Sequence, residues 1–80
     1  MSMKVLFFAQ LREVTGTPEA ELDGPEVGET DLWERLLARW PGLAVHRDQT
    51  RLARNGVYVD GSEIFRAEDE VALIPPVSGG

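Results

Sequence analysis

Strand-forming residues open the chain, and their alternation of apolar and polar side chains is incomplete. Residues 3–9 read Met-Lys-Val-Leu-Phe-Phe-Ala, a composition that predicts the first strand. Successive side chains point to opposite faces of a strand, which gives two sets: Met3, Val5 and Phe7 on one face, and Lys4, Leu6 and Phe8 on the other. Because the second face is also mostly apolar, we expect it either to be covered by another element or to be a docking surface.

One helix dominates the middle of the chain. Apolar residues recur there with helical spacing, at positions 32, 33, 36, 37 and 40, and Pro41-Gly42 follows as a stop signal. Thr30 and Asp31 are the N-cap candidates of this helix. Trp33 and Trp40 lie on its apolar stripe, so we interpret them as core residues rather than as a stack for a ligand.

Short strands separated by turn signals make up the rest of the sequence. We predict them at residues 19–22, 51–54, 57–59 and 71–74, with a weaker strand within 62–66 and one or two helical turns at 10–14. Asn55-Gly56, between two of these segments, is a strong signal for a tight β-hairpin. Residues 43–50 are interpreted as a connection.

This order of elements indicates an α+β fold with a mixed sheet and one main helix on one face, the β-grasp arrangement. The first and last strands then lie side by side and parallel at the centre of the sheet, joined by the crossover through the helix. In this geometry Val71 and Leu73 face the helix. Leu6, Phe8 and Ile74 gather on the open face, where we expect an apolar patch that docks a partner.

Size, charge and cysteine content narrow the classes of function. Eighty residues are enough for a single small domain. The formal net charge of −6 argues against nucleic acid as a partner and permits a basic protein partner. The absence of cysteine excludes disulfides and thiolate chemistry on this chain, and His46 has no neighbours at metal-ligand spacing. No segment is long and apolar enough for a signal peptide or a spanning helix, so we expect a cytoplasmic protein without a membrane partner.

The last six residues, Pro-Pro-Val-Ser-Gly-Gly, carry the candidate chemistry. Proline supplies no backbone N–H, so strand pairing should stop at Ile74, and we expect residues 1–76 to form the domain. Residues 77–80 are then a flexible tail that reaches roughly 13–14 Å, at about 3.3–3.6 Å per extended residue. Gly79 and Gly80 have no Cβ, so the tail can enter a narrow channel and its terminal carbonyl is open to attack. The alternative is a frayed and inert end.

Both ends of the chain and the hairpin between them resemble one known family. Residues 4–13 (Lys-Val-Leu-Phe-Phe-Ala-Gln-Leu-Arg-Glu), Gly16-Thr17, Asn55-Gly56 and residues 69–80 are similar to the small subunits of molybdopterin synthase, which are ubiquitin-like sulfur carriers. The helix and its flanking loops match only in pattern. Arg54 departs from the family, which usually has an apolar residue directly before the Asn-Gly pair.

The resemblance implies a mechanism centred on Gly80. An activating enzyme of the ubiquitin-activating type would adenylate its carboxylate with ATP, and a sulfur donor would convert it to a thiocarboxylate. The tail, with Gly79, would then enter the large subunit of molybdopterin synthase and pass sulfur to cyclic pyranopterin monophosphate, for the molybdenum cofactor. The residues expected to contact these partners are Leu6, Phe8, Ile74, Pro75, Pro76, Val77 and Ser78. This chain would bind no cofactor or metal itself and would act as a non-catalytic, sulfur-donating subunit.

Two rival interpretations remain open from the sequence. A related carrier would use the same thiocarboxylate chemistry for thiamine, for a thiolated tRNA base or for cysteine synthesis. A protein of a different class would be a ubiquitin-like binding module, whose inert tail would tolerate extension by one residue.

Overall fold

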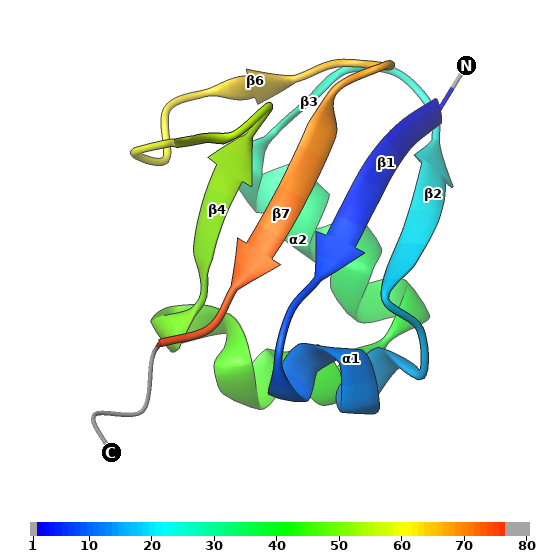
Figure 1. The fold of residues 1–80 in the computed structure, drawn as a ribbon. Helices are drawn as coiled ribbons and strands as arrows, with labels where there is room; N and C mark the ends of the chain where they lie inside the picture. Colours follow the sequence, from blue (N-terminus) through cyan, green and yellow to red (C-terminus); the bar gives the residue numbers. More distant parts are fainter. Residues whose placement is uncertain (1, 77–80) are drawn as a thin grey trace.

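A five-stranded mixed sheet with one long helix behind it forms the body of the protein (Figure 1). The structure is a computed structural model that describes residues 2–76, and Met1 and residues 77–80 lie outside the described part. The strands are β1 (Ser2–Phe7), β2 (Glu19–Asp23), β3 (Val27–Gly28), β4 (Arg51–Arg54), β5 (Val57–Tyr58), β6 (Ile64–Phe65) and β7 (Glu70–Ile74). The helices are α1 (Gln10–Thr15), α2 (Glu29–Arg39) and the 3-10 helix η1 (Pro41–Gln49).

The strand order β2-β1-β7-β4-β5 confirms the predicted α+β fold of the β-grasp type. β1 and β7 are parallel neighbours inside the sheet, with Leu6 opposite Ala72. β2 pairs antiparallel with β1, β4 with β7, and β5 with β4, so β2 and β5 are the two edges. A parallel pair needs a long crossover, and the chain makes it by way of α2, which covers one face of the sheet (Figure 1).

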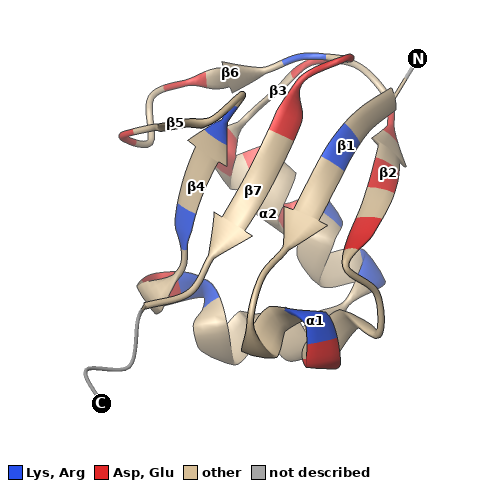
Figure 2. Ribbon diagram, in the orientation of Figure 1, with Lys and Arg blue, Asp and Glu red and all other residues tan. Residues whose placement is uncertain are grey.

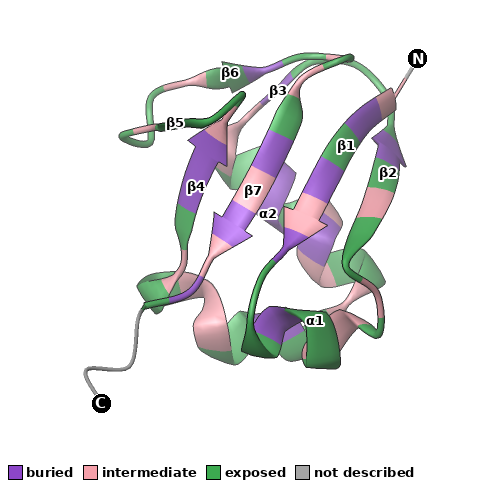
Figure 3. Ribbon diagram, in the orientation of Figure 1, coloured by how far each residue is buried: buried purple, intermediate pink, exposed green. Residues whose placement is uncertain are grey.

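The hydrophobic core lies between α2 and the sheet. The residues assigned to it by alternation and by helical spacing are buried, as predicted: Met3, Val5, Phe7, Val71, Leu73, Leu32, Trp33 and Leu36. Figure 3 shows buried segments alternating with more exposed ones along β1 and β7. Trp40 packs edge-on against Phe7, with the ring centroids 5.0 Å apart, so both tryptophans contribute to the core, as predicted.

The start of α2 differs from the prediction. The helix begins at Glu29 and the N-cap position is Gly28, so Thr30 and Asp31 lie within the first turn and are not the N-cap. The reason is β3, a strand that the sequence did not reveal, which pairs with β6 inside the weak strand predicted at residues 62–66. Gly28 is opposite Ile64 in this sheet and is extended, with φ −79° and ψ 177°. The chain therefore passes directly from a β-bridge into the helix, without a loop for a capping side chain.

Residues 43–50, predicted to be a connection, are helical over most of their length. Pro41 begins η1, where its missing N–H would have no helical partner. Leu43 is fully buried in the core, and η1 packs against α1 and α2. This segment is thus part of the folded body rather than a solvated loop.

Candidate functional site

The open face of the sheet, opposite α2, carries a row of apolar residues. The strand register places Leu6 opposite Ala72, Ala72 opposite Ala53, and Ala53 opposite Tyr58. Residues directly opposite one another on neighbouring strands project from the same face. Ala53 is buried, Leu6 and Ala72 are half-buried, and Tyr58 is 52% exposed at the end of the row.

A second group of residues lies at the end of this face where the last strand leaves the sheet. Ile74, the final residue of β7, is opposite Arg51 of β4, and alternation places Ile74 on the same face as Ala72. Phe8 directly follows β1 and is 43% exposed, so η1 does not cover it. The structure therefore brings the predicted residues Leu6 and Ile74 onto one face, with Phe8 exposed at the adjoining end of β1. We call the set Leu6, Phe8, Ala53, Tyr58, Ala72 and Ile74 the apolar patch.

A strained turn holds the backbone at Phe8. The Leu11 N–H donates to the Phe8 carbonyl oxygen at 3.0 Å, and Ala9 between them has φ 50° and ψ −131°. These are the angles of the first central position of a type II′ turn, which glycine usually occupies. A non-glycine residue in such a conformation stores on the order of 1–3 kcal/mol of strain. The strain lies where β1 ends and the apolar patch begins.

The point at which the chain leaves the sheet is well defined. β7 ends at Ile74, as the two prolines predicted. Pro75 is buried and Pro76 is exposed, so the first proline anchors the end of the strand and the second lies at the surface. The remaining residues of the predicted site lie outside the described residues: Val77, Ser78, Gly79 and Gly80.

Arg51 and Tyr58 border the apolar patch on the side of β4 and β5. The guanidinium of Arg51 lies 4.1 Å from the centroid of the Tyr58 ring, a cation–π contact. Sequence reasoning missed both residues. A signal was available, because a two-residue loop at Asn55-Gly56 fixes the hairpin register and pairs Ala53 with Tyr58.

Hydrogen bonds connect the β4–β5 hairpin to the start of β7. Asn55 and Gly56 have φ values of 50° and 87°, as a type I′ turn requires. The Asn55 side chain donates to the Asp69 carboxylate at 3.1 Å and accepts from the Glu70 N–H at 2.9 Å. The Arg66 N–H donates to the same carboxylate at 2.8 Å, and this bond is the main reason that the pKa of Asp69 is lowered, partly against desolvation.

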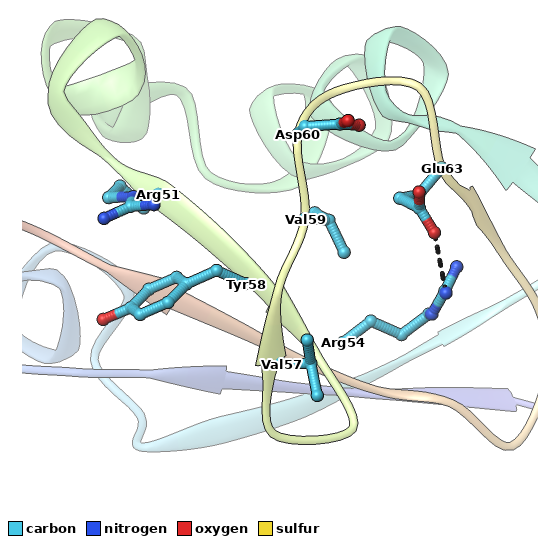
Figure 4. Close-up of a pocket in the computed structure, with 7 residues that line it drawn as sticks. All are labelled: Arg51, Arg54, Val57, Tyr58, Val59, Asp60 and Glu63. Atoms are coloured by element: carbon cyan, nitrogen blue, oxygen red, sulfur yellow. Dashed lines mark ion pairs between the residues drawn. The ribbon is translucent and has the colours of Figure 1, made fainter.

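A hollow of about 400 Å³ opens between the hairpin and the loop that precedes β6 (Figure 4). Its lining residues are Arg51, Arg54, Val57, Tyr58, Val59, Asp60 and Glu63. The Arg54 guanidinium pairs with Glu63 at 2.7 Å and donates to the Ile64 carbonyl oxygen at 2.9 Å. Arg54, the departure from the resembled family, therefore has a structural role: it ties β4 to the segment of β6.

The described residues hold no candidate metal centre. Within residues 2–76, no three His, Cys, Asp or Glu side chains are grouped so that they can bind a metal ion. In the same part of the chain, no polar or charged residue is buried. Between Ser2 and Pro76, no helix combines the length and the apolar character that crossing a membrane requires.

Known proteins resemble this chain along its whole length. The sequence matches the ThiS family over residues 5–80. It is 44% identical to the molybdopterin synthase sulfur carrier subunit of Drosophila yakuba, over 100% of this chain and 92% of that protein. Among solved structures, a putative molybdopterin converting factor subunit 1 from Pyrococcus furiosus has a TM-score of 0.84 and 30% identity, covering 96% of this chain and 99% of that one. SAMP1 from Haloferax volcanii also has a TM-score of 0.84, with 33% identity over 100% of both chains.

Proposed function

Because this chain belongs to the ThiS family, we propose that it is the sulfur carrier subunit of a molybdopterin synthase. The observation that carries the proposal is similarity along the full length to a protein of that name, in a family match that extends to Gly80. The fold is compatible with this role, since β7 leads the chain out of the centre of the sheet beside the apolar patch.

Sulfur is carried on the C-terminal carboxylate of Gly80. A partner enzyme of the ubiquitin-activating type joins a carboxylate oxygen to the α-phosphorus of ATP and releases pyrophosphate, which converts a poor leaving group into AMP. A donor of sulfur at the oxidation level of sulfide then attacks the carbonyl carbon, and AMP departs with the original oxygen. The product is a thiocarboxylate, an anionic sulfur nucleophile that requires no cysteine on this chain.

The second partner is the large subunit of molybdopterin synthase. Gly79 and Gly80 have no side chain, so a narrow channel in that subunit can admit the tail together with Val77 and Ser78. The thiocarboxylate sulfur there replaces an oxygen substituent on a carbon of cyclic pyranopterin monophosphate, and water cleaves its bond to the carbonyl carbon of Gly80, which regains its carboxylate. Two such deliveries complete the dithiolene that binds molybdenum. The surface residues that dock on the partners are Leu6, Phe8, Ile74 and Pro76, while the buried Pro75 holds the end of the strand beneath them.

The test is a one-residue change at the C-terminus. Adding an alanine after Gly80, or deleting Gly80, should abolish thiocarboxylate formation: the alanine places a Cβ next to the activated carboxylate, and the deletion shortens the tail that must reach the activating site. The matched control adds the same alanine at the N-terminus and should react like the wild type. Intact-mass spectrometry, after incubation with the activating enzyme, ATP and a sulfur donor, detects the replacement of oxygen by sulfur.

The same experiment separates the rivals. The thiocarboxylated wild type, mixed with the large subunit and cyclic pyranopterin monophosphate, should yield molybdopterin. If the C-terminally extended variant reacted in the mass-spectrometric assay as completely as the wild type, the result would instead favour an inert tail. If the thiocarboxylated chain reacted only with acceptors of thiamine synthesis, tRNA thiolation or cysteine synthesis, the protein would be a sulfur carrier of that pathway instead.

A further inference from the structure

Charge is distributed unevenly around the apolar patch (Figure 2). β2 lies beside β1, and its residues on the open face are all acidic and exposed: Glu19, Glu21 and Asp23. Glu70, at the start of β7, is exposed and lies opposite Lys4. Lys4 is the one cation in β1, β2 and β7, and it pairs with Glu19 at 3.6 Å. We call Glu19, Glu21, Asp23 and Glu70 the acidic flank.

Two arginines of α2 contact the backbone of the acidic flank and not its carboxylates. Arg39 of α2 donates to the backbone carbonyl oxygen of Glu21 at 2.8 Å, and Arg35 donates to that of Asp23 at 3.3 Å. Both guanidinium groups thus bind the backbone of the edge strand from the helix side. The carboxylates of Glu21 and Asp23 can therefore interact electrostatically with a partner that approaches the open face.

The opposite border of the apolar patch carries a cation on the open face, although Asp60 and Glu63 line the neighbouring hollow. Arg51 projects from the open face of β4, and its guanidinium stacks on the Tyr58 ring. Arg54, the other charged residue of β4, is held by Glu63 at 2.7 Å. The patch is therefore bounded by carboxylates along β2 and by a guanidinium along β4, so a partner that covers it meets two edges of different charge.

From this arrangement, and resting on the proposed function, we propose that the large synthase subunit docks through an apolar centre with a Lys- or Arg-rich edge facing β2. Its opposite edge presents carboxylate or carbonyl acceptors to Arg51. Complementary electrostatic potentials accelerate the encounter of the two proteins. They also penalise wrong orientations, because a wrong orientation brings like charges together. A partner of this polarity meets the sheet in one orientation only, and that orientation fixes the direction in which the chain beyond Ile74 enters it.

A different explanation of the acidic flank is edge protection. Charged side chains on an edge strand such as β2 discourage pairing with the edge of a second copy. That explanation requires charge on β2 but no basic edge on a partner. The two explanations differ in what a charge reversal changes: the rate of association with the large subunit, or the oligomeric state of the free chain.

The test compares two charge reversals that alter the net charge equally. Glu21→Lys reverses a member of the acidic flank, and Glu34→Lys reverses an exposed carboxylate of α2, on the covered side of the sheet. Stopped-flow association with the purified large subunit is measured at low and at high salt. We expect Glu21→Lys to slow association roughly tenfold at low salt, with the difference disappearing at high salt, and Glu34→Lys to stay within about twofold of the wild type.

Two further variants complete the design. Arg51→Glu should also slow association, and Glu21→Gln, which places no second cation beside Lys4, should slow it by roughly threefold. Urea unfolding of each variant establishes that it is folded. Equal rates for Glu21→Lys and Glu34→Lys would overturn the inference while leaving the proposed function intact, as would a Glu21→Lys protein that associates normally but dimerises. A wild-type chain that fails to bind the large subunit at any salt concentration would contradict the proposed function itself.

Discussion

Phe8 is 43% exposed, although the neighbouring aromatic Phe7 is buried in the core. Leaving a phenyl ring in water forfeits part of the stabilisation that its burial would give. The turn that follows Phe8 also carries strain, because residues other than glycine are disfavoured at the φ of 50° that Ala9 adopts. Two unfavourable features at adjacent residues support the proposal that this corner contacts a partner.

Phe8→Glu should therefore weaken binding and leave folding nearly unchanged. A charge placed in a desolvated contact costs roughly 3 kcal/mol, or about a hundredfold in the Kd for the large subunit. Val45→Glu, at a residue of η1 that is 81% exposed, introduces the same group elsewhere and should alter neither property. Calorimetric titration and thermal melts measure the two effects. A Phe8→Glu protein that binds normally but melts far below the wild type would place Phe8 in the core.

Secondary-structure elements could be predicted from sequence wherever their pattern is long. β1, β4, β7 and the apolar stripe of α2 have enough residues for alternation or helical spacing to appear. β3 and β6 have two residues each, too few for any period: β6 lies within the weak strand predicted at residues 62–66, but β3 was missed, and the N-cap of α2 is Gly28 rather than the predicted Thr30 or Asp31. η1 was missed because Pro41-Gly42 resembles an ordinary stop signal.

The candidate site was predictable to the same extent. Leu6 and Ile74 follow from strand alternation, and the end of β7 follows from the two prolines. The strained turn at Ala9 was not predictable, because its usual marker is glycine and the sequence has alanine there. The border formed by Arg51 and Tyr58 required the register between strands, which a single strand does not display.

The stability of the hairpin formed by β4 and β5 should depend on pH through the ionisation of Asp69. The folded-state pKa of this carboxyl is lowered from 3.8, mainly by the Arg66 N–H, so its ionised form stabilises the fold at neutral pH. That stabilisation is lost as the pH falls through the lowered pKa. Asp69→Asn should therefore unfold at a lower urea concentration than the wild type at neutral pH, and the gap should narrow on acidification to about pH 3.

Asp48→Asn is the matched control for this prediction. Asp48 is exposed in η1, away from the hairpin, so its substitution should leave the urea midpoint at neutral pH unchanged. A gap between Asp69→Asn and the wild type that keeps the same size from neutral to acidic pH would show that the carboxylate charge is not the source of the stabilisation.

At the scale of the whole molecule, we propose that the fold separates stability from the sulfur chemistry. The core, the sheet and the hairpin network are all built within residues 2–76. The central strand β7 ends the folded body, and the residues proposed to carry sulfur come after it. A carrier that must be charged by one enzyme and discharged on another benefits from this separation, because neither reaction then needs to disturb the core.

This separation predicts different outcomes for two truncations that end only two residues apart. A chain of residues 1–76 should melt within about 2 °C of the full chain, because the buried Pro75 is retained. A chain of residues 1–74 loses that proline, whose burial is worth about 1–2 kcal/mol, and should melt about 5–10 °C lower. Neither chain should form a thiocarboxylate. If the 1–76 chain melted as low as the 1–74 chain, the tail would be part of the folded body, and the domain boundary proposed after Pro76 would be wrong.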